Sequence, residues 1–331
     1  MTVDWSLLLF ATLAVLVQSA VTGAEGVPKM KWADDTRTSR PFAKDPSVIR
    51  FGGRYLVYFS LPPATGRNLP PGWAIGIAES KDLIAWRRVG EMLPEQECEA
   101  QGLCAPGARV LDGKVHLFYQ TYGNGKKDAI CHAVADDGLK FTRNPTNPIF
   151  RPSGDWTCGR AIDAEAIEFG DRMLLYCATR DPAFKMQMVA VAAADRRSGF
   201  GREAWKQIHD GPVLKPELPW ETKCIEAPSL MKRGDRLFMF YAGGYNNEPQ
   251  QIGCASSKDG VHFTRLFREP LLPNGKPGTW NSSESGHPGV FVDDDGQTYL
   301  FYQGNNDQGK TWFLSFVKIG WKDEKPYVMP E

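Results

Sequence analysis

Residues 226–243 read EAPSLMKRGDRLFMFYAG, and this form recurs at four other places in the chain. Each copy has a short apolar run, a tight turn that carries Gly with Asp or Arg, and a second run that ends in aromatic residues. Turn residues between two alternating apolar runs predict a β-hairpin. The copies start 60, 58, 63 and 61 residues apart. The other four read DPSVIRFGGRYLVYFS from Asp45, APGARVLDGKVHLFYQT from Ala105, DAEAIEFGDRMLLYCAT from Asp163 and HPGVFVDDDGQTYLFYQG from His287.

A third apolar run follows every hairpin and a fourth follows most of them, as WAIGIAES and WRRVGEML do after the first copy. Four antiparallel strands in each of five successive units predict an all-β fold, the five-bladed β-propeller. Five homologous four-strand units do not fit a β-sandwich. We expect residues 25–331 to form this one domain. Two segments compete to supply its last outer strand: MKWADD near residue 30 and KPYVMPE at the end.

The composition fits an ordinary globular protein and argues against two classes of partner. Hydrophobic residues make up 42% of the chain and charged residues 24%. The 39 Lys and Arg residues balance the 39 Asp and Glu residues. The chain therefore has no general electrostatic reason to bind nucleic acid or an anionic membrane. Aromatic residues, at 11%, suit stacking on sugar rings and a strand-rich core equally well.

The N-terminal segment reads WSLLLFATLAVLVQSAVTGAEG. Its apolar run has the length of a signal-peptide core and is short for a membrane span. The small residues Thr22, Gly23 and Ala24 fit a cleavage site. We expect residues 1–24 to be a signal peptide and the protein to be secreted or periplasmic. An uncleaved anchor is the alternative, because no Lys or Arg precedes the run.

Two of the seven cysteines, Cys98 and Cys104, lie in one loop, ECEAQGLC, and would pair in an oxidising compartment. Cys131, Cys177 and Cys254 lie inside apolar runs, which favours buried thiols. The chain has no C-x-x-C pair, so a structural zinc site is not expected.

The first residue of each copy is where the copies differ most. In a propeller the first strand of each blade lines the central channel, so these residues are expected on one ring. Charged groups there carry a desolvation cost that packing alone does not select. The alternative is a set of turn residues, which suits the Asp-Pro step at Asp45. Glu165 lies two residues after Asp163, on the same side of its strand, and is expected to back it up. The ring consists of Asp45, Ala105, Asp163, Glu226 and His287.

Carboxylates that face a shared pocket suit glycoside hydrolysis. One carboxyl group donates its proton to the leaving oxygen, and another activates water or attacks the sugar. A third carboxylate nearby raises the pKa of the acid by like-charge repulsion. Asp45, Asp163 and Glu226 are therefore the predicted catalytic residues.

The three acidic segments together resemble glycoside hydrolase family 43, a group of five-bladed propellers. KDPSVI resembles its first motif, which makes Asp45 the general base. AIDAEAI resembles its third-blade motif, in which Asp163 tunes pKa and orientation. CIEAPSL resembles its Glu-Gly-Pro motif, with Ala227 in place of Gly, which makes Glu226 the general acid. The resemblance spans all five blades and implies an inverting mechanism, with base and acid about 6.5–9.5 Å apart.

The segment GHPGVFVDDDG resembles the fifth-blade histidine segment of the same family, where the histidine lies beside a calcium ion or a water cluster. His287 is accordingly a candidate metal residue that would reach an axial calcium through water, although calcium prefers oxygen ligands. No cofactor is expected to be required beyond this structural calcium. Trp220 would stack on sugar rings, unless it is a blade-entry aromatic like Trp156 and Trp280 at the same offset. The candidate substrate-binding residues are Arg160, Trp73, His287 and Trp220.

The expected function is an exo-acting glycosidase that removes a terminal arabinofuranosyl, xylosyl or galactosyl unit from a carbohydrate. A glycoside phosphorylase is one alternative and would need a basic cluster by the base, for which Lys44 and Arg160 are candidates. A carbohydrate-binding propeller without catalysis is the other. Such a protein would carry one similar site in each blade, whereas these copies differ most at their first residue.

Overall fold

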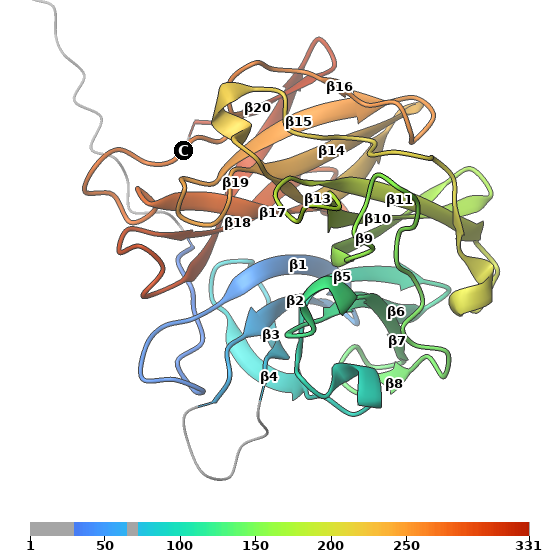
Figure 1. Ribbon diagram of the computed structural model, residues 1–331. Helices are drawn as coiled ribbons and strands as arrows, with labels where there is room; N and C mark the ends of the chain where they lie inside the picture. Colours follow the sequence, from blue (N-terminus) through green and yellow to red (C-terminus); the bar gives the residue numbers. More distant parts are fainter. Residues whose placement is uncertain (1–29, 65–71, 331) are drawn as a thin grey trace, which may run out of the picture.

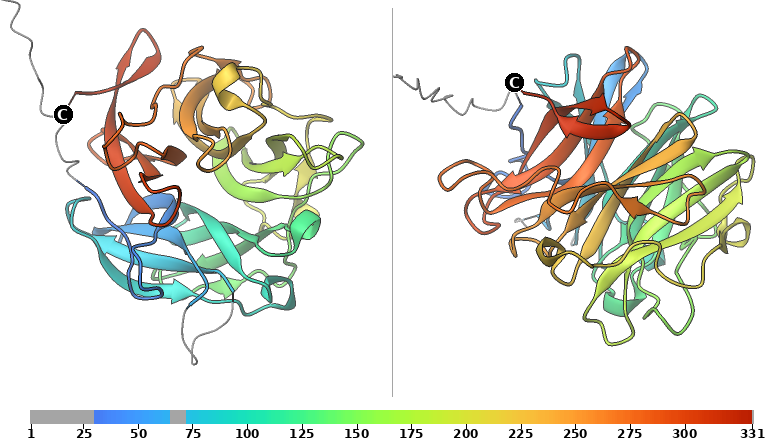
Figure 2. Two further views of the ribbon diagram at one scale, coloured as in Figure 1. Left: turned by 60° about the vertical axis from the view of Figure 1, so that its left-hand side comes forward. Right: turned by 90° about the horizontal axis from the view of Figure 1, so that it is seen from above.

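The computed structural model describes residues 30–64 and 72–330, and these form five four-stranded antiparallel sheets. Figure 1 and Figure 2 show the sheets arranged as blades around a common axis. The predicted five-bladed propeller is confirmed. The predicted signal peptide and most of the Pro-rich loop before Trp73 lie outside the described residues. Within the described part of the chain, no helix is long and apolar enough to cross a membrane.

Each blade uses four consecutive strands, and the first of them lies at the axis (Figure 1). The strands are β1 (Lys44–Phe51), β2 (Arg54–Leu61), β3 (Ala74–Ser80) and β4 (Arg87–Met92) in blade 1; β5 (Leu103–Leu111), β6 (Lys114–Thr121), β7 (Ile130–Ala135) and β8 (Thr142–Arg143) in blade 2; β9 (Ile162–Phe169), β10 (Arg172–Arg180), β11 (Gln187–Asp195) and β12 (Lys206–Gln207) in blade 3; β13 (Ile225–Arg233), β14 (Arg236–Gly243), β15 (Gln251–Ser257) and β16 (Thr264–Arg265) in blade 4; and β17 (Glu284–Val292), β18 (Thr298–Asn305), β19 (Phe313–Lys322) and β20 (Lys325–Val328) in blade 5.

The connections between strands contain single turns of 3-10 helix, while the outer strands of blades 2, 3 and 4 are only two residues long. In the segment FTRNPTNPIF of blade 2, the prolines lack the N–H that a strand ladder needs. Pairing resumes beyond them at one isolated bridge, between Phe150 and Ile130. The 3-10 turns are η1 (Glu97–Glu99), η2 (Gly125–Lys127), η3 (Arg202–Ala204) and η4 (Pro219–Glu221).

The hydrophobic core is divided among the five junctions between neighbouring blades. Each of five clusters of buried residues draws its side chains from two adjacent blades. At the junction of blades 5 and 1, for example, Phe59 packs with Phe301 and Leu314. Because each blade buries both of its faces in this way, the apolar runs are nearly continuous rather than alternating.

Blade 5 is completed by both of the competing segments. The later half of β19 pairs with β20, from Ile319↔Val328 to Lys322↔Lys325. The earlier half of β19 exchanges backbone hydrogen bonds with Trp32, through Trp32 N to Leu314 O at 2.9 Å and Leu314 N to Trp32 O at 2.7 Å. Ser315 Oγ also donates to Met30 O at 2.6 Å. The outer edge of the last blade is therefore shared between the two ends of the described chain.

Neighbouring inner strands are joined by one repeated contact near the axis. At three junctions a side chain accepts a backbone N–H from the next blade: Ser47 from Ala108, Glu165 from Leu230, and Ser229 from Val290. At the other two junctions the equivalent residue is glycine. A Cβ on Gly107 would lie 2.1 Å from Ala164 O, and one on Gly289 would lie 2.2 Å from Pro46 O. The blades approach too closely there for any side chain.

Glu165 thus has a different task from the one predicted. Its Oε1 accepts the N–H of Leu230 and pairs with Arg109 Nη2, while Arg109 Nε donates to Ala166 O at 2.6 Å. Burial raises the pKa of Glu165, and Arg109 works against that rise. Its carboxylate is committed to bracing blades 3 and 4, so the expectation that it backs up Asp163 is wrong.

Candidate active site

Each inner strand begins with one residue whose backbone φ is positive, which is the left-handed region that side chains usually avoid. A bulge in the pairing with the second strand accompanies it in every blade. Bulges of this kind turn a side chain away from the ladder and recur beside active sites. These left-handed positions are Asp45 (φ 56°), Ala105 (47°), Asp163 (54°), Ala227 (49°) and His287 (46°).

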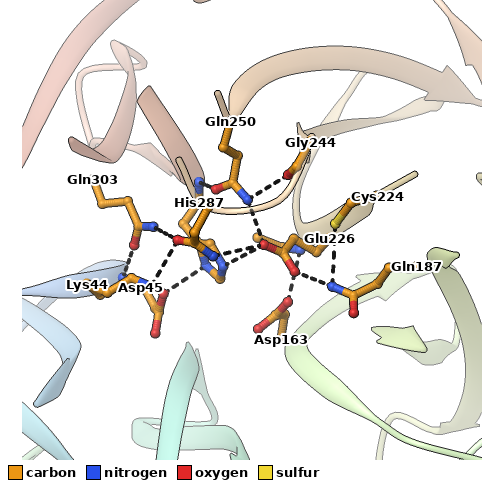
Figure 3. Close-up of polar contacts among 12 residues, drawn as sticks. Lys44, Asp45, Asp163, Gln187, Cys224, Glu226, Gly244, Gln250, His287 and Gln303 are labelled. Atoms are coloured by element: carbon orange, nitrogen blue, oxygen red, sulfur yellow. Dashed lines mark hydrogen bonds and ion pairs between the residues drawn. The ribbon is translucent and has the colours of Figure 1, made fainter. Parts of the chain in front are cut away.

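In blade 4 the left-handed residue is Ala227 and not Glu226. The alignment of the copies from sequence therefore starts the fourth copy one residue too early. Glu226 lies one step before the left-handed position of its blade, where Lys44 lies in blade 1. Blade 3 is longer than its neighbours because the connection between β11 and β12, residues 196–205 with η3, exceeds the matching connections of the other blades. The carboxylate of Glu226 nevertheless reaches the axis beside Asp163 and His287, as Figure 3 shows.

The preceding blade holds the backbone of each left-handed residue. Asp45 N donates to Gln303 Oε1 at 3.0 Å and Asp163 N donates to Gln120 Oε1 at 2.7 Å. The remaining three follow the same rule, with acceptors on Ser60 for Ala105, on Asp163 for Ala227 and on Gln250 for His287. The five first residues are therefore aimed by their neighbours around the ring.

His287 lies between two carboxylates at the centre of this ring (Figure 3). Its Nδ1 is 3.0 Å from Asp45 Oδ1 and its Nε2 is 3.6 Å from Glu226 Oε1. Ligating atoms of Asp163, Glu226 and His287 all lie within 4.8 Å of one another. Burial works against a charged imidazole, but Asp45, Asp163 and Glu226 outweigh it and raise the pKa of His287 to about 9. The ring is thus a positive charge surrounded by three carboxyl groups.

The pKa of Asp163 is raised in this cluster, whereas that of Glu226 is lowered. Burial raises the pKa of Asp163 to about 7, and the nearby charge of Glu226 adds to the rise. Glu226 is equally buried, but His287 and the amide of Gln250, which donates to Oε1 at 2.6 Å, hold the pKa of its carboxyl below the usual range. Gln187 donates to the other oxygen. The expectation that like-charge repulsion raises the pKa of Glu226 is wrong for the free protein, because these donors stabilise its carboxylate.

The donor set at the axis does not suit a calcium ion bound through His287. Both ring nitrogens face carboxylates, and the raised pKa places a proton on each of them. Calcium takes oxygen ligands, and a protonated imidazole has no lone pair to offer. This chemistry argues only against direct coordination by His287. The prediction that His287 reaches an axial calcium through water is not tested by this geometry and stays a prediction.

A cavity of 650 Å³ continues along the axis behind the ring. All five inner strands line it, from the left-handed positions at one end to residues of the hairpin-turn face, such as Arg50, Lys232 and Asp294, at the other. The cavity shows that Asp45 and Asp163 border open space, whereas Glu226 is not among the residues that line it.

Comparison with protein families is decisive at this point. The model of the glycosyl hydrolases family 43 matches residues 38–326. The chain belongs to glycosyl hydrolase family 43. A thermostable family-43 glycoside hydrolase of known structure superposes with a TM-score of 0.69 at 19% identity, over 87% of this chain and 93% of that one. The family assignment and the five-bladed fold therefore agree.

Two curated relatives of this chain have different activities. A 1,2-β-oligomannan phosphorylase from Thermoanaerobacter sp. (strain X514) is 24% identical over 60% of this chain and 64% of its own length. A non-reducing end α-L-arabinofuranosidase from Bacteroides ovatus is 24% identical over 70% of this chain and 40% of its own length. The family 43 chain thus spans well under the full length of both relatives.

The predicted substrate-binding residues of this family 43 chain fall in different places. Arg160 is buried at the rim, with its Nε 3.3 Å from Asp128 Oδ2. Trp73 packs edge-to-face against Tyr122, at 5.4 Å between ring centroids. Trp220 stacks on Tyr241 at 5.9 Å, and its Nε1 donates to Arg268 O. These contacts give Trp220 a packing role between strands, as in the alternative interpretation.

Four glutamines of the site are missing from the sequence-based prediction, which includes Lys44 only as a basic residue near the base. Gln303 and Gln120 follow the aromatic pair in FYQG and FYQT, so a repeated glutamine was visible in two copies. Gln187 and Gln250 precede or begin the third strands, where no repeat marks them. The Nζ of Lys44 donates to Asn246 Oδ1 at 3.0 Å and lies 4.4 Å from the centroid of the Trp312 ring.

Proposed function

We propose that this family 43 chain is a glycoside hydrolase that inverts the anomeric centre and removes a terminal sugar from a carbohydrate chain. One observation carries the proposal. Asp45 and Glu226 face opposite nitrogens of His287, and Asp163 lies beside Glu226. Two carboxylates on opposite sides of one small site are what acid–base hydrolysis of a glycosidic bond requires.

Asp45 is the general base in this proposal. Among the described residues, no hydrogen-bond donor engages its buried Oδ1 with good geometry, although His287 is 3.0 Å away. That oxygen is buried against the imidazole, so in this proposal the other carboxylate oxygen of Asp45 accepts the proton of the water molecule. The imidazole between Asp45 and Glu226 keeps the two carboxylates apart, which favours the wider spacing of about 6.5–9.5 Å over the about 5–5.5 Å of retaining enzymes.

Glu226 is the general acid, and it draws its proton from a carboxyl pair that it shares with Asp163. The two groups titrate together, and the raised pKa of about 7 at Asp163 keeps one proton in the pair near neutral pH. When the glycosidic oxygen of a substrate approaches Glu226, the shared proton moves to Glu226, which donates it to that oxygen. His287 then balances the remaining negative charge.

The proposed substrate, a carbohydrate with a terminal sugar at its non-reducing end, is suggested by the relatives of this chain. The Bacteroides ovatus relative is a non-reducing end α-L-arabinofuranosidase. An exo-acting enzyme for terminal arabinofuranosyl, xylosyl or galactosyl units fits this neighbourhood. We also propose that the protein is secreted or periplasmic, since polysaccharides are met outside the cytoplasm.

The test replaces the base and the acid separately, as Asp45→Asn and Glu226→Gln. Each change removes one proton-transfer group, and we expect kcat/KM to fall by about 10²- to 10⁴-fold on a substrate found by screening aryl glycosides and oligosaccharides. Asp171→Asn, on an exposed hairpin turn, is the matched control and should keep wild-type activity. Near-full activity of either site variant would refute the assignment. The anomer first released, followed by NMR, tests inversion.

A glycoside phosphorylase is the second candidate, because a 1,2-β-oligomannan phosphorylase is among the relatives. Lys44 provides a cation beside the base. Burial opposes its charge, but Asp45, Glu284 and Glu226 outweigh burial and raise the pKa of Lys44. Turnover that needs inorganic phosphate and yields a sugar phosphate would select this function over hydrolysis.

A further inference from the structure

Arg180 is a positively charged side chain at the rim of the site that has no carboxylate partner among the described residues. It ends β10, at the same edge of blade 3 where β9 begins with Asp163. The side chain is half-buried, and its Nε donates to Gln187 Oε1 at 2.8 Å. The rest of its guanidinium fork, with Nη1 and Nη2, is left for another acceptor.

Two aromatic rings hold this guanidinium in place. Its Cζ lies 4.4 Å from the centroid of the Phe184 ring and 5.1 Å from that of Tyr245, which belong to blades 3 and 4. Phe184 has a φ of 62°, which is rare for a bulky side chain. Backbone strain of this kind is found at ligand clamps, where the surroundings enforce it.

The loop that carries Phe184 is built firmly enough to enforce such strain. Asp181 Oδ1 accepts the backbone N–H groups of Lys185 at 2.6 Å and Met186 at 2.8 Å. Phe184 N itself donates to Asp181 O at 2.9 Å. The carboxylate of Asp181 is thus occupied within its own turn, and the turn presents Phe184 to the guanidinium.

Arg180 is connected to the proposed acid through a single side chain. Gln187 accepts from Arg180 through its side-chain oxygen. Its side-chain nitrogen donates to Glu226, as Figure 3 shows. Two further cations approach the Phe184 ring: Arg160, which is paired with Asp128, and the exposed Lys126 at 5.6 Å from the centroid. The rim beside Glu226 therefore carries an excess of positive charge.

We propose that Arg180 binds the carboxylate of a uronic acid residue in the substrate, on the leaving-group side of the scissile bond. A planar guanidinium donates two parallel hydrogen bonds to a carboxylate, and the flanking rings keep the fork oriented before the sugar arrives. This inference rests on the proposed function in placing a carbohydrate at the site and in taking Glu226 as the general acid, which defines the leaving-group side. A free phosphate nucleophile would enter beside Asp45, whereas Arg180 lies on the side of Glu226.

Binding without turnover tests the proposal. The probes are disaccharides that contain galacturonate or glucuronate, the methyl esters of the same disaccharides, and inorganic phosphate, each titrated by calorimetry. We expect the wild-type protein to bind at least one acid about tenfold or more tighter than its ester, as a charge-assisted hydrogen-bond pair predicts. In Arg180→Gln the acid and its ester should bind within about twofold of each other. Arg180→Lys, which keeps the charge but loses the fork, should fall between the two.

Lys127→Gln is the matched control, because it removes an exposed charge from the same rim outside the clamp. It should keep the wild-type preference. Equal binding of every acid and its ester by the wild-type protein, or an unchanged preference in Arg180→Gln, would overturn the proposal. Arg180-dependent binding of phosphate with no preference for the acids would overturn it as well. Because no turnover is measured, failure of the proposed hydrolysis would be seen separately, in the Asp45 and Glu226 variants.

Discussion

Glu165 shows how far a single residue can be interpreted from its position in a strand. Alternation correctly places it on the axial side of β9, two residues after Asp163. Its partners come from other blades, Arg109 from β5 and the backbone of Leu230 from β13, and these the sequence does not reveal. Residue type and periodicity predict the direction of a side chain, while its task depends on what the fold brings opposite.

The bracing role of Glu165 leads to a test by Glu165→Gln. The change leaves Arg109 without its ion-pair partner near the axis, and we expect a loss of about 1–3 kcal/mol in the free energy of unfolding. Because Glu165 does not face the substrate, kcat/KM should stay within about threefold of wild type. Chemical denaturation and steady-state kinetics measure the two effects. A large loss of activity at unchanged stability would restore the catalytic interpretation.

Glu226 marks the limit of alignment by eye at the same scale. The sequence correctly indicates a carboxylate at the start of blade 4, but it misplaces that residue by one position relative to the other copies. Blade 3 carries additional residues between β11 and β12, so spacing along the chain does not fix the register of the next copy. The pKa order of Asp163 and Glu226 could not be predicted either, because it depends on His287 and on the amide of Gln250 beside Glu226.

At the scale of the element, Gly107 and Gly289 are the positions where two inner strands come closest. Gly107→Ala or Gly289→Ala would place a Cβ about 2 Å from a backbone carbonyl of the next blade, which must then move. We expect each change to lower the free energy of unfolding by about 1–3 kcal/mol or more. Gly199→Ala, where a Cβ would meet nothing within 4 Å, is the control. If Gly107→Ala and Gly289→Ala unfold at the same temperature as Gly199→Ala, the close approach of the inner strands is contradicted.

The cysteines are free thiols, and Cys98 lies beside Cys131 rather than forming the expected pair with Cys104. Cys98 Sγ lies 4.0 Å from Cys131 Sγ, on β7, while Cys104 is buried on β5. The sulfur atoms need to approach by about 2 Å to form a bond. Under mild oxidation we therefore expect peptide mapping by mass spectrometry to find a Cys98–Cys131 cross-link, which Cys98→Ser abolishes. A Cys98–Cys104 cross-link instead would show that the loop rearranges.

The hairpins of the inner two strands could be predicted from sequence, but the outer strands could not be bounded. The apolar runs and turn residues of the hairpins are strong local signals, and all five appear where expected. The fourth runs shrink to two residues in three blades, because prolines and the blade edge leave few backbone groups to pair.

At the scale of the whole molecule, the charge stored at the axis makes stability depend on pH. The pKa of His287 is raised from 6.5 to about 9, so the folded protein holds a proton that the unfolded chain has released between these values. Stability from this group is complete below about pH 6.5 and is lost as pH rises through about 9. Asp163 and Glu284, with pKa values raised to about 7, act in the same direction at lower pH.

We therefore expect the free energy of unfolding to fall by about 1–3 kcal/mol between pH 7 and pH 9, and His287→Gln to remove most of that fall. Denaturant titrations at pH 7, 8 and 9 compare the two proteins. His287→Gln also changes the titration of Asp163 and Glu226, so the difference between the two slopes reports His287 together with the carboxyl groups it acts on. Parallel slopes would mean that His287 is neutral in the folded protein.

The architecture of the whole was readable from sequence, because five similar units leave few other folds. The closure of the ring could not be predicted from sequence, because each of the two candidate segments could by itself pair as the outer strand of blade 5. The structure uses both, with Trp32 and β20 on the two halves of β19. Only the geometry of blade 5 shows that they do not compete for the same backbone groups.

The side chains that hold each left-handed residue from the blade before it have a consequence for how such a protein can change. A blade transplanted into another propeller would bring its carboxylate along but leave behind the glutamine that aims it. Gln303 belongs with Asp45, and Gln120 with Asp163, although a different blade carries each partner. A working carboxylate of this site therefore requires two neighbouring blades to change or be transferred together, because one blade carries the carboxylate and the other the side chain that orients it.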